Sequence, residues 1–466
     1  MQLTYEPEKK RKKSVRNYLI IASNVVLLFL LINFLPYEPQ VNKGLALLVF
    51  VAILWLTEAI HVTTTAVFVP VLAVALGLTD TKPALASFAD PTIFLFLGGF
   101  VLAGALHVQK LDILIANKIM YLAKGKLSYA VFYLFIATAV LSMWISNTAT
   151  VAMMLPLVVG VLGQLDREKH HNTYVFVLLG IAYSASIGGM GTVVGSPPNA
   201  IVASQLNLSF AEWMKMGIPM VLVLLPITLT IIYFVFKPDL NHKFEQGTTP
   251  QIEMNTDRWI TLGIFIFTAL CWIFSNEINP IVAKLVGFDG KFTNFDTFIS
   301  LSAFILICVS QVSRWKDLQH NVDWGVLLLF GGGLTLSMIL KDSGASKVMA
   351  DFLVSLIKGS HFFVIGLIVA FFIVFLTEFT SNTASAALLV PIFYAISTEL
   401  GMSPLGLSMI IGLGASCAFM LPVATPPNAI VFGTGDIKQK EMMKAGFILN
   451  IFCAIIIAVA AYFFWL

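Results

Sequence analysis

ISNTA at residues 145–149 recurs as TSNTA at residues 380–384, and this pair of stretches decides the fold of the chain. Each Ser-Asn-Thr turn is flanked by two short apolar runs, at 129–145 and 149–163 in the first copy and at 361–376 and 384–398 in the second. A helix needs about 20 apolar residues to span a bilayer, so short arms around a polar turn predict a re-entrant hairpin whose tip stops inside the membrane. Two full crossings are the alternative. A hairpin and two crossings both return the chain to the same face of the membrane, so the distribution of charged residues cannot distinguish them.

Three further motifs recur in the same order and show an internal repeat. They are LGG at 97–99 and FGG at 330–332, LP at 155–156 and VP at 390–391, and SPPNAIV at 196–202 and TPPNAIV at 425–431. Each repeat unit contains an odd number of predicted spanning helices, so the two units have opposite orientations. Inverted repeats build secondary transporters, whose substrate and ion sites form at mid-membrane where the repeats meet. A duplicated channel or membrane enzyme is an alternative, but neither requires matched polar turns and matched helix breaks.

The composition is that of a polytopic membrane protein. Hydrophobic residues make up 58% of the chain and charged residues only 11%, against roughly a quarter charged residues in a soluble domain. The apolar runs predict an all-α membrane protein with about 11 transmembrane helices, two re-entrant hairpins and two broken helices. The four cysteines lie inside apolar runs without a CxxC pair, which indicates small hydrophobic side chains rather than a metal or redox site.

The positive charges orient the chain in the membrane. With a cytoplasmic N-terminus, 20 of the 28 Lys and Arg residues fall on the cytoplasmic side and the C-terminus lies outside. The predicted organisation begins with a cytoplasmic basic arm at 1–17 and a scaffold at 18–127. A transport part with the cytoplasm-side hairpin follows at 128–236, and a cytoplasmic linker at 237–258 joins it to the second half. That half contains a second scaffold part at 259–358 and a second transport part, with the outside-facing hairpin and the last helix, at 359–466.

The Ser-Asn-Thr turns carry the chemistry expected of a binding site. A turn inside the membrane frees backbone polar groups that lipid cannot satisfy, so it must be buried in protein or line a wet cavity. Hydroxyl and amide oxygens can coordinate a monovalent cation, and hydroxyl and amide hydrogens can bind a carboxylate. Simple capping of the hairpin helices is the structural alternative. Two matched copies favour a binding role.

The Pro-Pro-Asn motifs predict two broken helices. Proline removes a backbone donor and prevents normal helix continuation, so a Pro-Pro pair interrupts the helix. The break exposes carbonyl oxygens that suit sodium and a helix N-terminus that suits an anion. Gly188, Gly189, Gly191 and Gly195 would let the first broken helix unwind around an ion. A plain proline kink is the alternative.

These residues resemble the divalent anion/sodium symporter family, and in particular bacterial sodium–dicarboxylate transporters such as those for succinate. The resemblance covers essentially the whole chain and rests on the doubled Ser-Asn-Thr, the doubled Pro-Pro-Asn and the inverted repeat. It implies an elevator-like sodium symporter for C4-type dicarboxylates that forms a homodimer in the lipid bilayer of the bacterial inner membrane. Wider relatives carry citrate, sulfate, arsenite or protons, so the resemblance leaves the substrate open.

The resemblance also implies ligands at matching positions, with at least two co-transported sodium ions. One sodium is expected at Ser142, Ser146, Asn147 and the backbone near Gly195, and a second at Thr377, Thr380, Asn382 and the carbonyls of Ala424 and Pro426. The dicarboxylate is expected between the two tips, at Asn147, Thr148, Asn382, Thr383 and Thr425.

The remaining polar residues refine the expected mechanism. No Arg or Lys lies within an apolar run near the turns or breaks, so sodium and polarised donors must neutralise a dianion. Glu378 could modulate ion binding, but a structural partner role is the stronger expectation. His170 and His171 are expected to be surface residues. No His or Lys accompanies either serine in sequence, which argues against a covalent enzyme. An exchanger of the same fold, a transporter of citrate or sulfate, and a channel remain rivals.

Overall fold

The computed structural model describes residues 15–243, 253–357, 361–399 and 401–465. Residues 1–14 of the basic arm, 244–252 of the linker and 358–360 at the last predicted boundary lie outside the described residues. Helices dominate the described part, as predicted. Eight of them are long and apolar enough to cross a membrane, and further apolar helices are shorter. The predicted fold class is confirmed.

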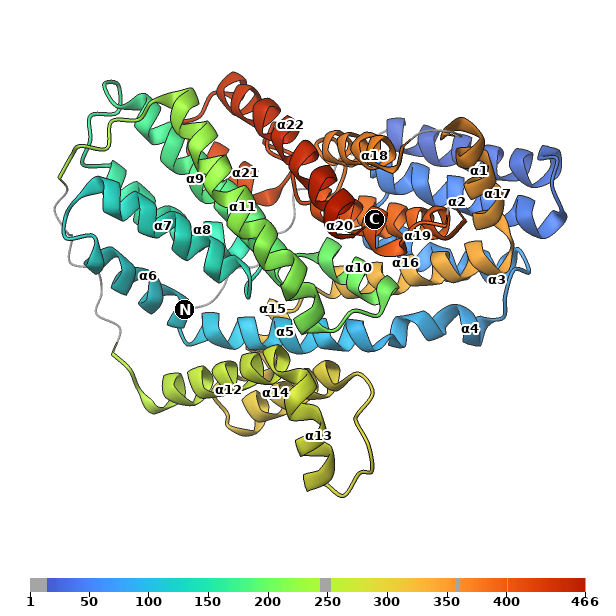
Figure 1. Cartoon of the computed structure of the whole chain (residues 1–466), viewed down its shortest axis with the longest axis horizontal. Helices are drawn as coiled ribbons and strands as arrows, with labels where there is room; N and C mark the ends of the chain where they lie inside the picture. The colour runs from blue at the N-terminus through green and yellow to red at the C-terminus, as the bar shows by residue number, and fades with distance from the viewer. Residues whose placement is uncertain (1–14, 244–252, 358–360, 400, 466) are drawn as a thin grey trace.

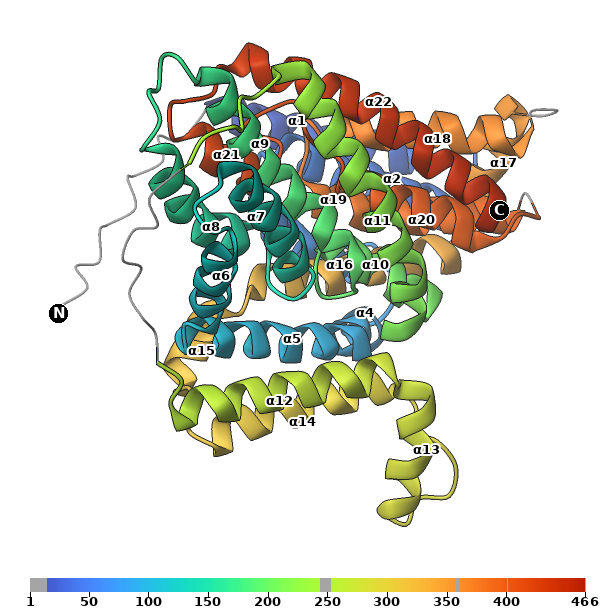
Figure 2. The same ribbon diagram turned by 60° about the vertical axis from the view of Figure 1, so that its left-hand side comes forward.

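Two groups of helices, one from each half of the chain, flank the hairpins. The first group comprises α1 Val15–Phe34, α2 Pro39–Thr57, α3 Val62–Ala75, α4 Thr81–Ala86, η1 Ser87–Ala89, α5 Pro91–Val108 and α6 Leu111–Leu122. The second comprises α12 Thr256–Ile273, α13 Ser275–Leu285, α14 Phe295–Val309, α15 Trp315–Asn321, α16 Trp324–Asp342 and α17 Ala345–Ile357. We call these helices the flanking helices. Helices α12 to α14 lie along the outer side of α5, with α13 projecting from the body (Figure 2).

The hairpins and broken helices form two further groups. Hairpin unit 1 contains α7 Leu127–Ser142, α8 Asn147–Leu162, α9 His171–Gly188, η2 Gly189–Gly191, α10 Pro197–Leu206 and α11 Phe210–Phe236. Hairpin unit 2 contains α18 Phe362–Leu376, α19 Asn382–Glu399, α20 Pro404–Gly414, α21 Pro426–Phe432 and α22 Gln439–Phe464. The α7/α8 and α18/α19 hairpins lie at opposite ends of the molecule (Figure 1). Opposite entry is what an inverted repeat requires.

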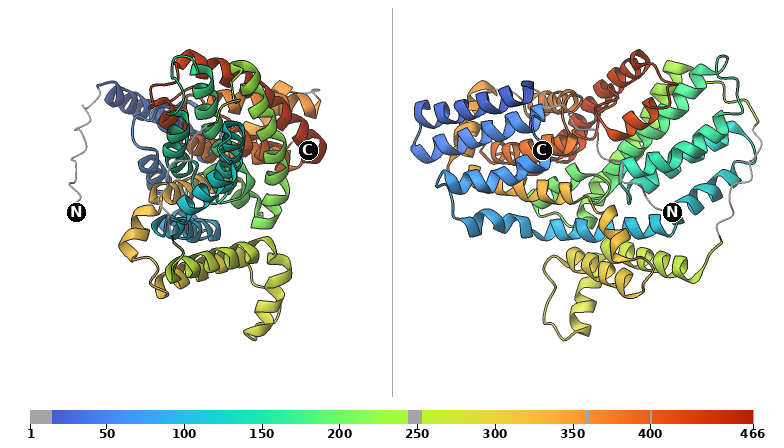
Figure 3. Two further views of the ribbon diagram at one scale, coloured as in Figure 1. Left: turned by 90° about the vertical axis from the view of Figure 1, so that its left-hand side faces the viewer. Right: turned by 180° about the vertical axis from the view of Figure 1, so that it is seen from behind.

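The Gly-Gly motifs of the repeat allow two matched helix contacts. A Cβ on Gly98 of α5 would lie within 3 Å of the backbone of Ser300 on α14, and a Cβ on Gly332 of α16 would collide with the backbone of Ala66 on α3. Each repeat therefore packs one of its helices closely against a helix of the other. The view from behind shows α3 beside α16 and α14 beside α5 (Figure 3).

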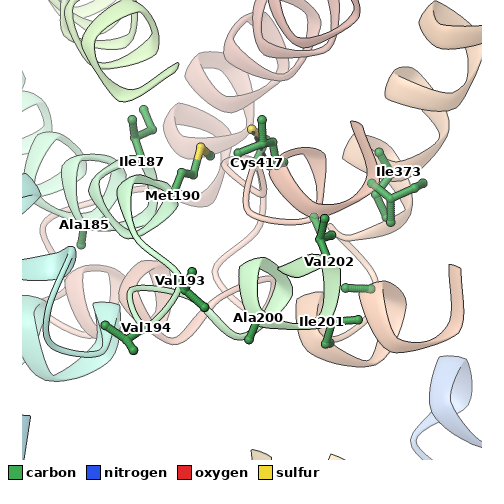
Figure 4. Close-up of a cluster of buried hydrophobic side chains, with 14 of the residues drawn as sticks. Ala185, Ile187, Met190, Val193, Val194, Ala200, Ile201, Val202, Ile373 and Cys417 are labelled. Carbon is green, nitrogen blue, oxygen red and sulfur yellow. Dashed lines mark hydrogen bonds between the residues drawn. The ribbon is translucent and has the colours of Figure 1, made fainter. Parts of the chain in front are cut away.

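Each broken helix stops before its Pro-Pro pair, as predicted. Helix α9 ends at Gly188, a single 3₁₀ turn follows, and α10 begins at Pro197. Helix α20 ends at Gly414, and α21 begins at Pro426. The apolar stretch at residues 406–421 is therefore helical only as far as Gly414. Side chains around the breaks, including Met190 and Cys417, form a buried apolar cluster between the two units (Figure 4).

Candidate substrate and cation site

Each hairpin tip is organised by one contact between a hydroxyl and an asparagine. Ser142 Oγ lies 2.6 Å from the side-chain amide of Asn147, and Thr377 Oγ1 lies 2.6 Å from that of Asn382. In both tips the two residues are five positions apart, at the end of one hairpin arm and the start of the other. The serine of each Ser-Asn-Thr caps the second arm by accepting from the backbone N–H three residues later. Capping and site formation therefore occur together.

The Asn147 amide reaches from the tip into the first helix break. Its nitrogen is best satisfied when it donates to Ser142 Oγ at 2.6 Å, to the Ala185 carbonyl at 3.1 Å and to the Gly195 carbonyl at 3.3 Å. Gly189 must lack a side chain here, because a Cβ would collide with the Asn147 amide. The tip of the hairpin and both ends of the break are thus joined through one residue.

A second asparagine in each repeat ties the two half-helices together. Asn199 Nδ2 donates to the carbonyls of Gly189 (2.8 Å) and Thr192 (2.7 Å). Asn428 Nδ2 donates in the same way to Ala418 (3.0 Å) and Leu421 (3.1 Å). These are the asparagines of the Pro-Pro-Asn motifs. Sequence reasoning found the motifs but not this role, which fixes the loop between the half-helices.

Glu378 is a structural partner of the second break. One of its carboxylate oxygens accepts from the backbone N–H groups of Phe419 (2.7 Å) and Met420 (2.9 Å), and the other accepts from Leu421 N–H (3.0 Å). Asn450 Nδ2 donates to the same carboxylate at 2.7 Å. A carboxylate that is 1% exposed and accepts these four bonds is stabilised in place. It orders the loop that precedes Ala424 and Thr425.

A cavity of about 950 Å³ connects the two tips and the two breaks. Ten of the predicted site residues line it: Ser146, Asn147, Thr148, Gly195, Thr380, Asn382, Thr383, Ala424, Thr425 and Pro426. Ser142 and Thr377 are fully buried behind the two asparagines rather than on the cavity wall. The two breaks differ, because Thr425 caps α21 through Asn428 N–H whereas Ser196 lies 3.4 Å from Ser416 Oγ.

The flanking helices supply the part of the wall that sequence reasoning missed. Residues from α5, from the end of α15 and from the start of α16 line it, together with Glu58 after α2. They include Phe100, His107, His320, Asp323 and Trp324. No signal in the sequence marked them, because they come from three separate places in the chain. Among the described residues that line the cavity there is no Lys or Arg. Without these permanent cations, a dianion there would depend on hydrogen-bond donors, the wall histidines and bound cations for neutralisation.

An inverted repeat whose polar tips and broken helices line one shared cavity defines a secondary transporter. The chain belongs to the citrate transporter family, whose family description matches residues 52–398. The resemblance to divalent anion/sodium symporters is confirmed, and the family and its relatives are transporters rather than enzymes.

Two relatives agree with this family, and one solved structure has a similar fold. An uncharacterized transporter of Haemophilus influenzae is 64% identical over 97% of this chain and 98% of its own length. The sodium-dependent dicarboxylate transporter SdcS of Staphylococcus aureus is 34% identical over 99% of this chain and 94% of its own. In structure, the YdaH transporter of Alcanivorax borkumensis superposes with a TM-score of 0.59 over 91% of this chain and 99% of that one, at 13% identity, and supports the fold alone.

Proposed function

We propose that the protein is a sodium-coupled symporter that imports C4-type dicarboxylates such as succinate. The observation that carries this proposal is the cavity in which both Ser-Asn-Thr tips and both helix breaks meet, with no Lys or Arg among the described residues that line it. A dicarboxylate brings two negative charges to a site whose charged wall residues include Glu58 and Asp323. Bound sodium ions compensate these charges, so substrate binding and sodium binding depend on each other. SdcS, named a sodium-dependent dicarboxylate transporter, supports the same assignment.

The cation ligands we propose are those predicted from the sequence. Asn147 and the Gly195 carbonyl meet in unit 1. In unit 2, Thr380 and Ala424 line the cavity beside Asn382. Oxygen atoms of hydroxyls, amides and backbone carbonyls are suitable ligands for sodium. The dicarboxylate is then held between Thr148 of one tip and Thr383 of the other.

We infer that the two hairpin units move together as the transport part while the flanking helices stay as the scaffold. The cavity reaches His107 and Trp324, at the ends of α5 and α16 that charge bias assigns to the cytoplasm. Near the opposite end of α5, Asp90 accepts from Ser204 Oγ (3.2 Å), and Asp296 of α14 accepts from Phe210 N–H (2.7 Å). A cavity that reaches the cytoplasmic ends of these helices, together with contacts that close the opposite side, corresponds to an inward-open state. The proposed location is the bacterial inner membrane, with the N-terminus cytoplasmic and the C-terminus outside. A homodimer would form through flanking helices.

The decisive experiment is uptake of labelled succinate into proteoliposomes under an inward sodium, potassium or proton gradient. Sodium alone should drive accumulation into empty vesicles. Uptake that requires a preloaded dicarboxylate and ignores sodium would instead identify an exchanger. Competition by unlabelled citrate or sulfate, measured in the same vesicles, distinguishes a transporter of those anions from one for C4 acids.

A further inference from the structure

Three potential metal ligands meet at the end of hairpin unit 1 away from α10. The ligand atoms of His170, Asp239 and His242 all lie within 4.8 Å of one another. The two imidazole rings are 4.5 Å apart between centroids and nearly perpendicular, at 77°. His242 Nε2 lies 3.0 Å from Asp239 Oδ2. His170 precedes α9, whereas the other two follow α11, so only the fold brings them together.

The backbone around these residues is already held in place. Asp239 N–H donates to Thr173 Oγ1 at 3.0 Å, which ties the segment after α11 to the first turn of α9. The His242 carbonyl accepts from Leu127 N–H at 3.0 Å, which ties the same segment to the start of α7. His170 N–H donates to the Asp166 carbonyl at 3.0 Å. Ligands on an anchored backbone lose little conformational freedom when they bind an ion.

The Asp239 carboxylate is held in a fixed orientation beside the histidines. Its Oδ1 accepts from the backbone N–H of Asn241 at 3.1 Å, whereas its Oδ2 faces His242. Asp239 is largely exposed and His170 and His242 are partly exposed, so an ion can reach them from solution.

We propose that His170, Asp239 and His242 form a binding site for a divalent transition-metal ion of the zinc class. Two imidazoles and one carboxylate are a common ligand set for Zn²⁺, Co²⁺ or Ni²⁺, and water completes the coordination. The site differs in kind from the proposed sodium sites, which consist of oxygen atoms. The ligands belong to hairpin unit 1 and the segment directly after it. Metal binding therefore links residues 237–243 to the start of α9 and stabilises this end of hairpin unit 1.

The test uses the full-length protein in detergent, without a polyhistidine tag and after treatment with a chelator. We expect wild-type protein to bind one Zn²⁺ per chain in a calorimetric titration and to melt at a higher temperature with the ion. Co²⁺ should give the visible absorption typical of a site with nitrogen ligands. His170→Ala, Asp239→Ala and His242→Ala should each weaken Zn²⁺ binding about tenfold or more, because each removes one of three protein ligands.

The neighbouring His171 provides a matched control. Its Nε2 lies 2.7 Å from Glu441 Oε1, away from the cluster. His171→Ala should retain Zn²⁺ affinity within about twofold, since it removes no proposed ligand. The proposal is overturned if wild-type protein binds no Zn²⁺, or if a variant lacking both His170 and His242 binds as well as wild type. Because this readout is metal binding, it is independent of whether succinate is the substrate.

Discussion

The two helix breaks reach similar geometries by different means. In both, the asparagine of Pro-Pro-Asn donates to two carbonyls of the preceding loop. In the second break the loop is also held by the Glu378 carboxylate, whereas the aligned residue of the first repeat is Met143. There the Met143 carbonyl accepts from Thr192 Oγ1, and Gly189 allows the backbone to pass close to Asn147. Symmetry therefore preserves the groups that face the cavity, while their supports differ.

The largest expected effect comes from locking either repeat against the flanking helices. A Cβ at Gly99 of α5 would lie 3.4 Å from Val194 Cβ in the first break, and one at Gly333 of α16 would lie 3.2 Å from Ala387 Cβ on α19. Both distances are close to those of disulfides, about 3.5–4.5 Å. In a background without native cysteines, Gly99→Cys with Val194→Cys, and Gly333→Cys with Ala387→Cys, should each stop transport on oxidation.

Reduction should restore transport in both double variants, and each single cysteine variant serves as its control. Complete cross-linking with unchanged uptake would refute a moving hairpin domain. Locking by only one of the two pairs would show that the repeats do not move as one body. The measurement is sodium-driven succinate uptake before and after a reductant.

The two tip asparagines should be equally important. Asn147→Ala and Asn382→Ala each remove an amide proposed to serve both a cation and the substrate, and leave buried partners unpaired. Two or more such losses, at about 1–3 kcal/mol each, correspond to a decrease in uptake of about 100-fold. Asn33→Ala removes an exposed amide that bonds only its own helix, at Phe29, and should be neutral. Near wild-type uptake by either tip variant would assign the site elsewhere.

Glu378 provides the sharpest test of the difference between the breaks. Glu378→Gln replaces one accepting oxygen by an amide NH₂ group that donates and would face backbone N–H groups, at a cost of about 1–3 kcal/mol. We expect a lower melting temperature and a rise of about tenfold in the sodium concentration for half-maximal uptake. Met143→Leu should change both values little, because only the main chain of Met143 bonds the first loop. Equal effects of the two substitutions would contradict the asymmetry described above.

The smallest effects are expected from the hydroxyls behind the asparagines. Ser142→Ala and Thr377→Ala each remove one hydrogen bond, worth about 1 kcal/mol, and should raise the half-saturating sodium concentration about fivefold. Thr377 should show the greater effect, because its Oγ1 also lies 3.0 Å from the Ala415 carbonyl. Ser397→Ala is the matched control, since this buried hydroxyl bonds only Phe393 of its own helix. Sodium dependence that is unchanged in both variants would move the cation sites elsewhere.

The amino-acid sequence by itself determined the inverted repeat, the two hairpins and the two helix breaks. These features arise from short-range chemistry, because proline interrupts a helix and a polar turn ends a short apolar run wherever they occur. Asn147 and Asn382 were predicted as candidate ligands for a similar reason, since each lies in a short motif that repeats in the same order in both halves. The positions at which helices end were less well predicted. In the second break the helix ends at Gly414, although the apolar residues continue beyond it.

Only the tertiary structure decided how these elements support one another. The contacts of Glu378 join residues 41 to 72 positions apart, and the cavity wall combines His107 with Trp324 from a distant segment. The histidine pair 170–171 separates in the same way, because one ring turns to His242 and the other to Glu441. Such pairings depend on how complete helices pack, and apolar periodicity records only that a side is buried, not which partner covers it.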